Sequence, residues 1–112
     1  MKFYFNKECS KCQEAYELIK GKGQSVEIVD YLNNPPSVET LKDIVSVLGI
    51  TPFELVRKKE PLFIENFEGK EFSDEEWLYI LSKNPILIER PIVIDGNKAI
   101  IGRPPIKVLN ML

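Results

Sequence analysis

Phe3-Tyr4-Phe5-Asn6-Lys7-Glu8-Cys9-Ser10-Lys11-Cys12 decides the fold, because an apolar strand gives way here to a helix at a pair of cysteines. These are the only two cysteines of the chain, which contains no histidine. The nucleophile of a reactive cysteine is the thiolate. A helix N-terminus stabilises a thiolate, since its first N–H groups lack partners and its dipole is positive there. The stretch therefore predicts a reactive thiol at the start of the first helix.

The flanking sequence predicts a β-α-β unit around this turn. Residues 2–5 read as a short aromatic strand, and residues 26–29 as a second strand. Between them, four residues share one helical face: Cys12, Ala15, Tyr16 and Ile19. Ser10 and Gln13 have the spacing of a capping box, and Gly21 and Gly23 end the helix. The helix is then a crossover, which makes the two strands parallel.

The middle of the chain reads as helical. Ser37 can cap a helix with an apolar face of Val38, Leu41, Val45 and Leu48 that Gly49 closes. Thr51-Pro52 begins a short helix, and residues 58–70 show no period and are expected to be a loop.

A better marked helix follows this expected loop. Ser73 and Glu76 form a capping box, and Phe72 and Trp77 are placed as a hydrophobic staple. Its buried face would consist of Trp77, Ile80 and Leu81, and it ends at Asn84-Pro85.

The C-terminal part returns to β structure. Residues 92–94 and 99–101 flank Asp95-Gly96, a dipeptide typical of hairpin turns. A last short helix is expected to point Ile106, Leu109 and Met111 inward. The order predicts an α/β protein with a thioredoxin-like fold: a four-stranded mixed sheet with a helical insertion between its βαβ and ββα halves. In such folds a cis-proline precedes the strand after the insertion, so we expect the Arg90–Pro91 bond to be cis.

Length and charge narrow the class of protein. The 112 residues suit one domain, expected to span residues 1–112, and a net charge of −2 provides no general attraction for nucleic acid or an anionic membrane. No apolar run is long enough for a membrane span and no leader opens the chain, so we expect a cytoplasmic protein. Thiols stay reduced there, which favours a redox-active C-x-x-C. A metal site is not expected, because two cysteines without histidine cannot complete a structural zinc site.

Arginine is rare in this sequence. Of 15 basic residues only three are arginines, Arg57, Arg90 and Arg103, and the last two precede prolines. The planar guanidinium matches oxyanions, whereas lysine is common on solvated surfaces. The three arginines are therefore either an anion site or unrelated surface residues.

Several strings of the sequence resemble the ArsC family of glutaredoxin-dependent arsenate reductases, over nearly the whole chain. The matching strings are Tyr4-Phe5-Asn6 before Cys9, Asp30-Tyr31-Leu32, Pro35-Pro36, Leu55-Val56-Arg57-Lys58, Asn84-Pro85-Ile86-Leu87-Ile88, Arg90-Pro91-Ile92-Val93 and Gly102-Arg103-Pro104. The resemblance implies a monomeric thiol oxidoreductase without a bound cofactor. Cys9 matches the family's nucleophile, and Arg57, Arg90 and Arg103 match the three arginines that hold arsenate or a similar oxyanion. Glutathione would then reduce the adduct, with glutaredoxin as protein partner.

The sequence departs from the family beside the nucleophile. Phe5 stands where a histidine is usual, and Ser10-Lys11-Cys12 replaces Gly-Thr-Ser. Cys12 lies on the same side of the helix as Cys9 and can resolve the adduct as an internal disulfide, which thioredoxin or glutaredoxin would reduce. Alternatively, Cys12 is a small packing residue. The C-x-x-C also resembles that of the Spx-type regulators, which sense oxidation and bind RNA polymerase, and a glutathione-dependent protein thiol reductase is a further alternative.

Overall fold

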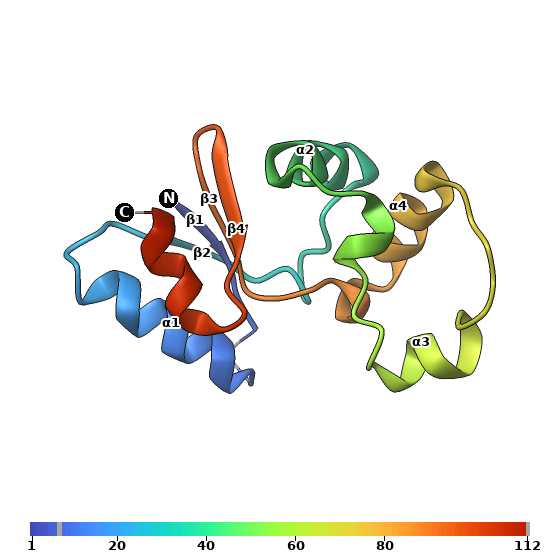
Figure 1. Cartoon of the computed structure of the whole chain (residues 1–112), viewed down its shortest axis with the longest axis horizontal. Helices are drawn as coiled ribbons and strands as arrows, with labels where there is room; N and C mark the ends of the chain where they lie inside the picture. The colour runs from blue at the N-terminus through green and yellow to red at the C-terminus, as the bar shows by residue number, and fades with distance from the viewer. Residues whose placement is uncertain (7, 112) are drawn as a thin grey trace. The chain divides into compact units, whose positions relative to one another are not determined.

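A four-stranded sheet joins the two ends of the chain in the computed structural model, in the order β2-β1-β3-β4 (Figure 1). Its strands are β1 (Lys2–Tyr4), β2 (Glu27–Val29), β3 (Ile92–Asp95) and β4 (Lys98–Ile101). β1 pairs with β2 in parallel and with β3 antiparallel, and Phe3 lies opposite Ile28 and Val93. β3 and β4 form the hairpin around Gly96, whose φ is +63°. The predicted α/β class and mixed sheet are confirmed.

The structure describes residues 1–6 and 8–111. The chain forms two compact units, one from Met1–Asn34 with Arg90–Leu112 and the other from Pro35–Glu89. The first unit contains the sheet, and the second is the helical insertion expected between the two halves. That residues 1–112 behave as one domain stays a prediction.

One face of the sheet is covered by α1 (Ser10–Lys20) and by the 3-10 helix η3 (Pro105–Met111), which pack against each other (Figure 1). The core of this unit consists of Phe3, Cys9, Cys12, Ala15, Ile19, Val93 and Val108. Two expectations are wrong here. Cys9 rather than Ser10 is the N-cap of α1, so the capping box does not form. Ile106 is 56% exposed and Val108 is buried in its place, because the last element is a 3-10 helix with a period of three.

The second unit contains two longer helices, α2 (Val38–Leu48) and α4 (Asp74–Lys83), and three short ones, η1 (Pro52–Leu55), α3 (Pro61–Asn66) and η2 (Pro85–Leu87). Ser37 caps α2 and Gly49 ends it at φ +71°, as predicted. Ser73 and Glu76 form the predicted capping box of α4. α3 falls where a loop was expected, because six residues are too few to show a period.

Aromatic side chains hold the second unit together. Trp77 of α4 contacts the rings of Phe53, Phe63, Phe67 and Phe72, with ring centroids 5.0 to 6.3 Å apart. Phe53 and Phe63 also contact each other, with centroids 6.4 Å apart. The Phe72–Trp77 pair, at 5.0 Å, is the predicted hydrophobic staple. α3 contributes Phe63 to this cluster. Burial of the Phe63 ring stabilises a helix that the sequence period does not reveal. Among the described residues, no helix is long and apolar enough to cross a membrane.

Candidate active site

Cys9 ends the turn after β1 and begins α1. Its backbone is extended, with φ −95° and ψ +113°, and its carbonyl accepts from the N–H of Gln13 at 3.2 Å. The Cys9 N–H donates to the carbonyl of Asn6 at 2.9 Å, which fixes the turn. The side chain is 7% exposed, so its sulfur lies at the helix N-terminus with little water around it. This is the position that the sequence predicts for a reactive thiol.

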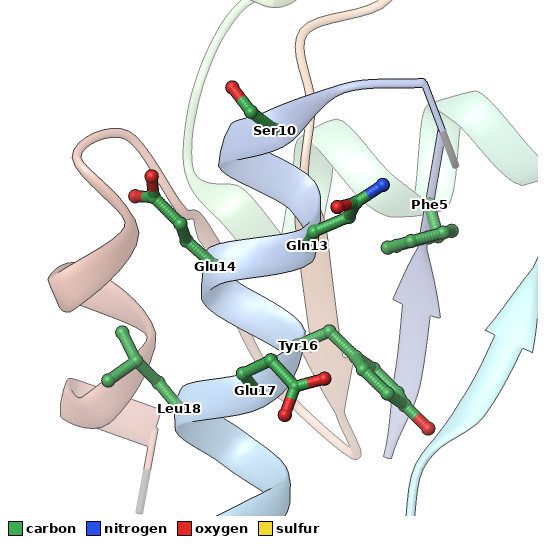
Figure 2. Close-up of a pocket in the computed structure, with 7 residues that line it drawn as sticks. All are labelled: Phe5, Ser10, Gln13, Glu14, Tyr16, Glu17 and Leu18. Carbon is green, nitrogen blue, oxygen red and sulfur yellow. The ribbon is translucent and has the colours of Figure 1, made fainter.

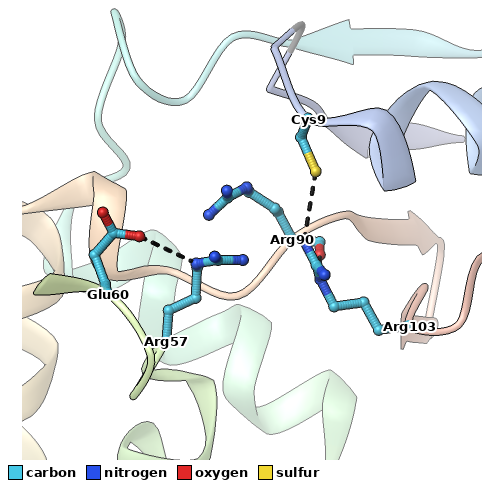
Figure 3. Close-up of polar contacts among 5 residues, drawn as sticks. All are labelled: Cys9, Arg57, Glu60, Arg90 and Arg103. Carbon is cyan, nitrogen blue, oxygen red and sulfur yellow. Dashed lines mark hydrogen bonds and ion pairs between the residues drawn. The ribbon is translucent and has the colours of Figure 1, made fainter.

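Arg103 donates a hydrogen bond directly to this sulfur. The distance from Arg103 Nη2 to Cys9 Sγ is 3.4 Å (Figure 3). Arg103 Nε donates to the backbone carbonyl of Arg90, which orients the guanidinium toward the thiol. In the sequence both arginines precede prolines. Nothing in the sequence indicates that the backbone of Arg90 holds the Arg103 side chain.

The segments that carry these two arginines are tied together. Both the Arg90–Pro91 and the Arg103–Pro104 bonds are cis, the first as expected and the second unforeseen. The N–H of Gly102 donates to the carbonyl of Pro91 at 2.9 Å. A Cβ added to Gly102 would lie 2.8 Å from Val108 Cγ1 and 3.0 Å from Pro91 Cγ. Only glycine therefore allows this approach, which brings Arg103 next to Arg90.

Arg90 has buried donors that other residues do not use. Its Nε and Nη1 have no hydrogen-bond partner among the described residues. Unsatisfied buried donors are costly, so a guanidinium in this state is prepared to bind an acceptor. An oxyanion provides acceptors in the planar geometry that arginine matches.

The two thiols have opposite acidities. Burial alone would raise the pKa of Cys9, but hydrogen bonds from the Cys12 N–H and thiol, with the hydrogen bond and charge of Arg90, lower it below its usual value. Burial raises the pKa of Cys12 to about 12, and the hydrogen bond and charge of Cys9 add to this effect. Cys9 is thus the thiolate of the pair, and Cys12 holds its proton.

Arg57 belongs to the second unit and is described by its own contacts. Its backbone N–H donates to the carbonyl of Leu87 at 2.7 Å, next to a β-bridge between Val56 and Ile88. Its Nε lies 3.5 Å from Glu60 Oε2, and both side chains are mostly buried (Figure 3). Sequence reasoning did not single out Glu60. The three-residue spacing from an arginine is the signal that could have found it.

A groove of about 880 Å³ runs along the outer side of α1 (Figure 2). It is lined by Phe5, Ser10, Gln13, Glu14, Tyr16, Glu17 and Leu18. None of the three arginines lines it and two carboxylates do, so this groove is unsuited to an oxyanion. Among the described residues, no group of three or more cysteine, aspartate or glutamate side chains could hold a metal ion.

The chain is similar to known proteins of one family. A model of the ArsC family matches residues 4–111. The uncharacterized protein YfgD of Escherichia coli K12 is 41% identical, over 100% of this chain and 96% of its own length. An arsenate reductase of Haemophilus influenzae is 40% identical, over 97% of this chain and 96% of its own. The structure of an arsenate reductase from Vibrio cholerae is 37% identical with a TM-score of 0.93, covering 100% of this chain and 98% of that one.

Proposed function

Because this chain belongs to the ArsC family, whose thioredoxin-like fold it shares, we propose that it is an oxidoreductase in which the Cys9 thiolate attacks arsenate or a similar oxyanion. The observation that carries this proposal is the hydrogen bond from Arg103 to a thiol whose pKa is lowered. Arg90 and Arg103 would hold the oxyanion. Arg57 is assigned the same role because Leu55-Val56-Arg57-Lys58 matches the family at this point.

The first step is a substitution at arsenic. Cys9 Sγ attacks the arsenic of dihydrogen arsenate, so a sulfur–arsenic bond forms and one arsenic–hydroxyl bond breaks. The hydroxide leaves with the bond's electron pair and becomes water by taking a proton. Arsenic stays pentavalent in this adduct. The guanidinium groups stabilise the charge that gathers on the remaining oxygens.

The second step reduces the arsenic, and Cys12 is the thiol that we propose for it. Its thiolate attacks Cys9 Sγ, which forms a disulfide and breaks the sulfur–arsenic bond. The electron pair of that bond stays on arsenic, which leaves as trivalent arsenite. The adduct itself favours this step, because Cys9 then no longer carries the charge that raises the pKa of Cys12.

An external thiol is the alternative reductant for the same adduct. Glutathione would take the place of Cys12, and a glutaredoxin would then reduce the mixed disulfide. With Cys12 as the resolving thiol, a thioredoxin or glutaredoxin would instead reduce the Cys9–Cys12 disulfide. Both routes need the reducing thiols of the cytoplasm, which is the location that we propose for a monomeric enzyme.

Arsenite production from arsenate tests the proposal. Wild type, Cys9→Ser and Cys12→Ser are each assayed with thioredoxin and its reductase, and separately with glutathione and glutaredoxin. We expect Cys9→Ser to be inactive with both systems. Cys12→Ser should lose turnover with thioredoxin if Cys12 resolves the adduct, and keep it with glutathione and glutaredoxin. Full activity of Cys9→Ser would overturn the proposal.

The two adjacent free thiols also favour a second candidate, an Spx-like regulator that forms a Cys9–Cys12 disulfide on oxidation. Such a protein would show no turnover with either reducing system and would bind RNA polymerase in only one redox state. A glutathione-dependent protein thiol reductase would instead reduce a disulfide-bonded protein substrate and leave arsenate unchanged. The same assays, with binding to RNA polymerase added, separate the three functions.

A further inference from the structure

We propose that Glu60 makes the oxyanion site selective for singly charged over doubly charged oxyanions. The inference rests on the proposed function, in which Arg57 contacts the oxyanion. It adds a residue that determines which ionic form of the substrate binds.

Glu60 directly compensates the charge of Arg57. Its Oε2 lies 3.5 Å from Arg57 Nε, and the two side chains are only 18% and 17% exposed. Water therefore screens this ion pair less than a surface pair. Arg57 Nε makes no hydrogen bond with any described residue, so the contact is an ion pair that leaves the guanidinium donors unsaturated.

The local backbone keeps Glu60 at this place. The Glu60 N–H donates to the carbonyl of Arg57 at 3.2 Å, and Glu60 is the N-cap of α3. A carboxylate at an N-cap normally accepts from the helix N–H groups. Glu60 makes no such side-chain bond within the described chain, and its carboxylate is directed to Arg57 instead.

This carboxylate repels any anion bound to Arg57, and the repulsion grows with the charge of that anion. Coulomb energy is proportional to the product of the charges, so Glu60 repels a doubly charged oxyanion with twice the energy of a singly charged one. Glu60 therefore disfavours a doubly charged oxyanion at Arg57 more strongly than a singly charged one.

The chemistry of the first step favours the same ionic form. A leaving hydroxide needs a proton, and the chain has no histidine to supply one. Cys12, with its pKa raised to about 12, is a weak acid. A singly charged oxyanion has one more proton than the doubly charged form and so brings its own.

Binding of two unreactive anions tests the inference on the full chain. Calorimetric titrations use phosphate and sulfate in one mildly acidic buffer, where phosphate carries one negative charge and sulfate two. If removing the Glu60 charge raises the affinity for phosphate by some factor, it should raise the affinity for sulfate by the square of that factor. We expect Glu60→Gln to raise phosphate affinity about threefold and sulfate affinity about tenfold, so the sulfate-to-phosphate ratio rises about threefold.

Three further variants separate the charge effect from other causes. Glu60→Asp keeps the charge and should keep the wild-type ratio, and Glu65→Gln removes a charge from an exposed position of α3 and should also keep it. A merely structural role of Glu60 would change both affinities by one factor. An unchanged ratio in Glu60→Gln therefore overturns the inference. Loss of anion binding by Arg57→Gln supports the proposed function, and no anion binding by any variant or by wild type overturns the proposed function itself.

Discussion

Arg90 and Arg103 affect the Cys9 sulfur in different ways at the residue scale. Arg103 Nη2 lies within hydrogen-bond distance of the sulfur, whereas Arg90 lowers the pKa of Cys9 and still keeps its Nε and Nη1 unused. Replacing Arg90 by glutamine removes a positive charge beside the thiolate, so the pKa of Cys9 should rise. Iodoacetamide alkylation of Cys9 should then slow by roughly threefold to tenfold at neutral pH, with its pH midpoint moved upward.

Lys11→Gln is the matched control for this measurement. Lys11 also lies in the first turn of α1, but it pairs with Glu14 at 4.0 Å and is not among the causes of the lowered pKa of Cys9. Its alkylation profile should follow wild type. A midpoint that moves equally in both variants would mean that net charge, rather than Arg90, controls the thiol.

The unused donors of Arg90 lead to a second prediction. Arg90→Lys keeps the positive charge but loses the planar fork, so sulfate or phosphate affinity should fall about tenfold. Calorimetric titration measures this directly. Unchanged affinity would contradict a bidentate role for Arg90, since a point charge would then serve as well.

At the scale of single elements, two serines show what the sequence can predict. The Ser73–Glu76 box forms, whereas the similar Ser10–Gln13 pair does not, because the chain enters α1 one residue earlier, at Cys9. Ser73→Ala should lower the free energy of unfolding by about 1 kcal/mol, while Ser10→Ala should change it by less than about 0.5 kcal/mol. Urea denaturation checks both. An equal loss in the two variants would show that Ser10 also acts as a cap.

Sequence patterns predicted the elements that carry a period or a cap, and they missed those that depend on distant contacts. α3 forms because Pro61 can begin a helix and Phe63 packs against Trp77 of another element. Val108 packs against the sheet and α1, and this contact decides which side of η3 is buried. The α-helical period used for the prediction therefore wrongly placed Ile106 on the buried side. The Arg103–Cys9 bond cannot be read from spacing along the chain, because 94 positions separate the two residues.

Gly102 connects β4 to Arg103 through a close backbone approach. Gly102→Ala would push on Val108 and Pro91, which are both buried and cannot move away easily. We expect a loss of about 1–3 kcal/mol in the free energy of unfolding and slower alkylation of Cys9, as Arg103 is displaced. Gly21→Ala is the control, because Gly21 has helical dihedrals of −62° and −19° that alanine adopts freely. Equal melting temperatures for wild type and Gly102→Ala would contradict the close approach.

At the scale of the whole molecule, the thiol pair links stability to pH. Cys12 keeps its proton up to a pKa of about 12 in the folded state, whereas an exposed thiol ionises at about 9. Between these values the unfolded chain binds fewer protons than the folded one, so the free energy of unfolding falls as pH rises. The slope that one thiol adds is at most about 1.4 kcal/mol per pH unit.

Cys12→Ala removes this contribution and should flatten the alkaline loss of stability. Urea denaturation of both proteins under reducing conditions, at mildly and at strongly alkaline pH, gives the free energy of unfolding of each. The stability advantage of wild type over Cys12→Ala should shrink as pH rises, because only the wild type has a buried thiol to keep protonated. Cys9, whose pKa is lowered, contributes with the opposite sign, since its stabilising effect is present above the usual pKa and is lost as pH falls through the lowered value. Parallel curves for wild type and Cys12→Ala would show that Cys12 ionises like an exposed thiol, and the assignment of Cys9 as the thiolate of the pair would lose its electrostatic basis.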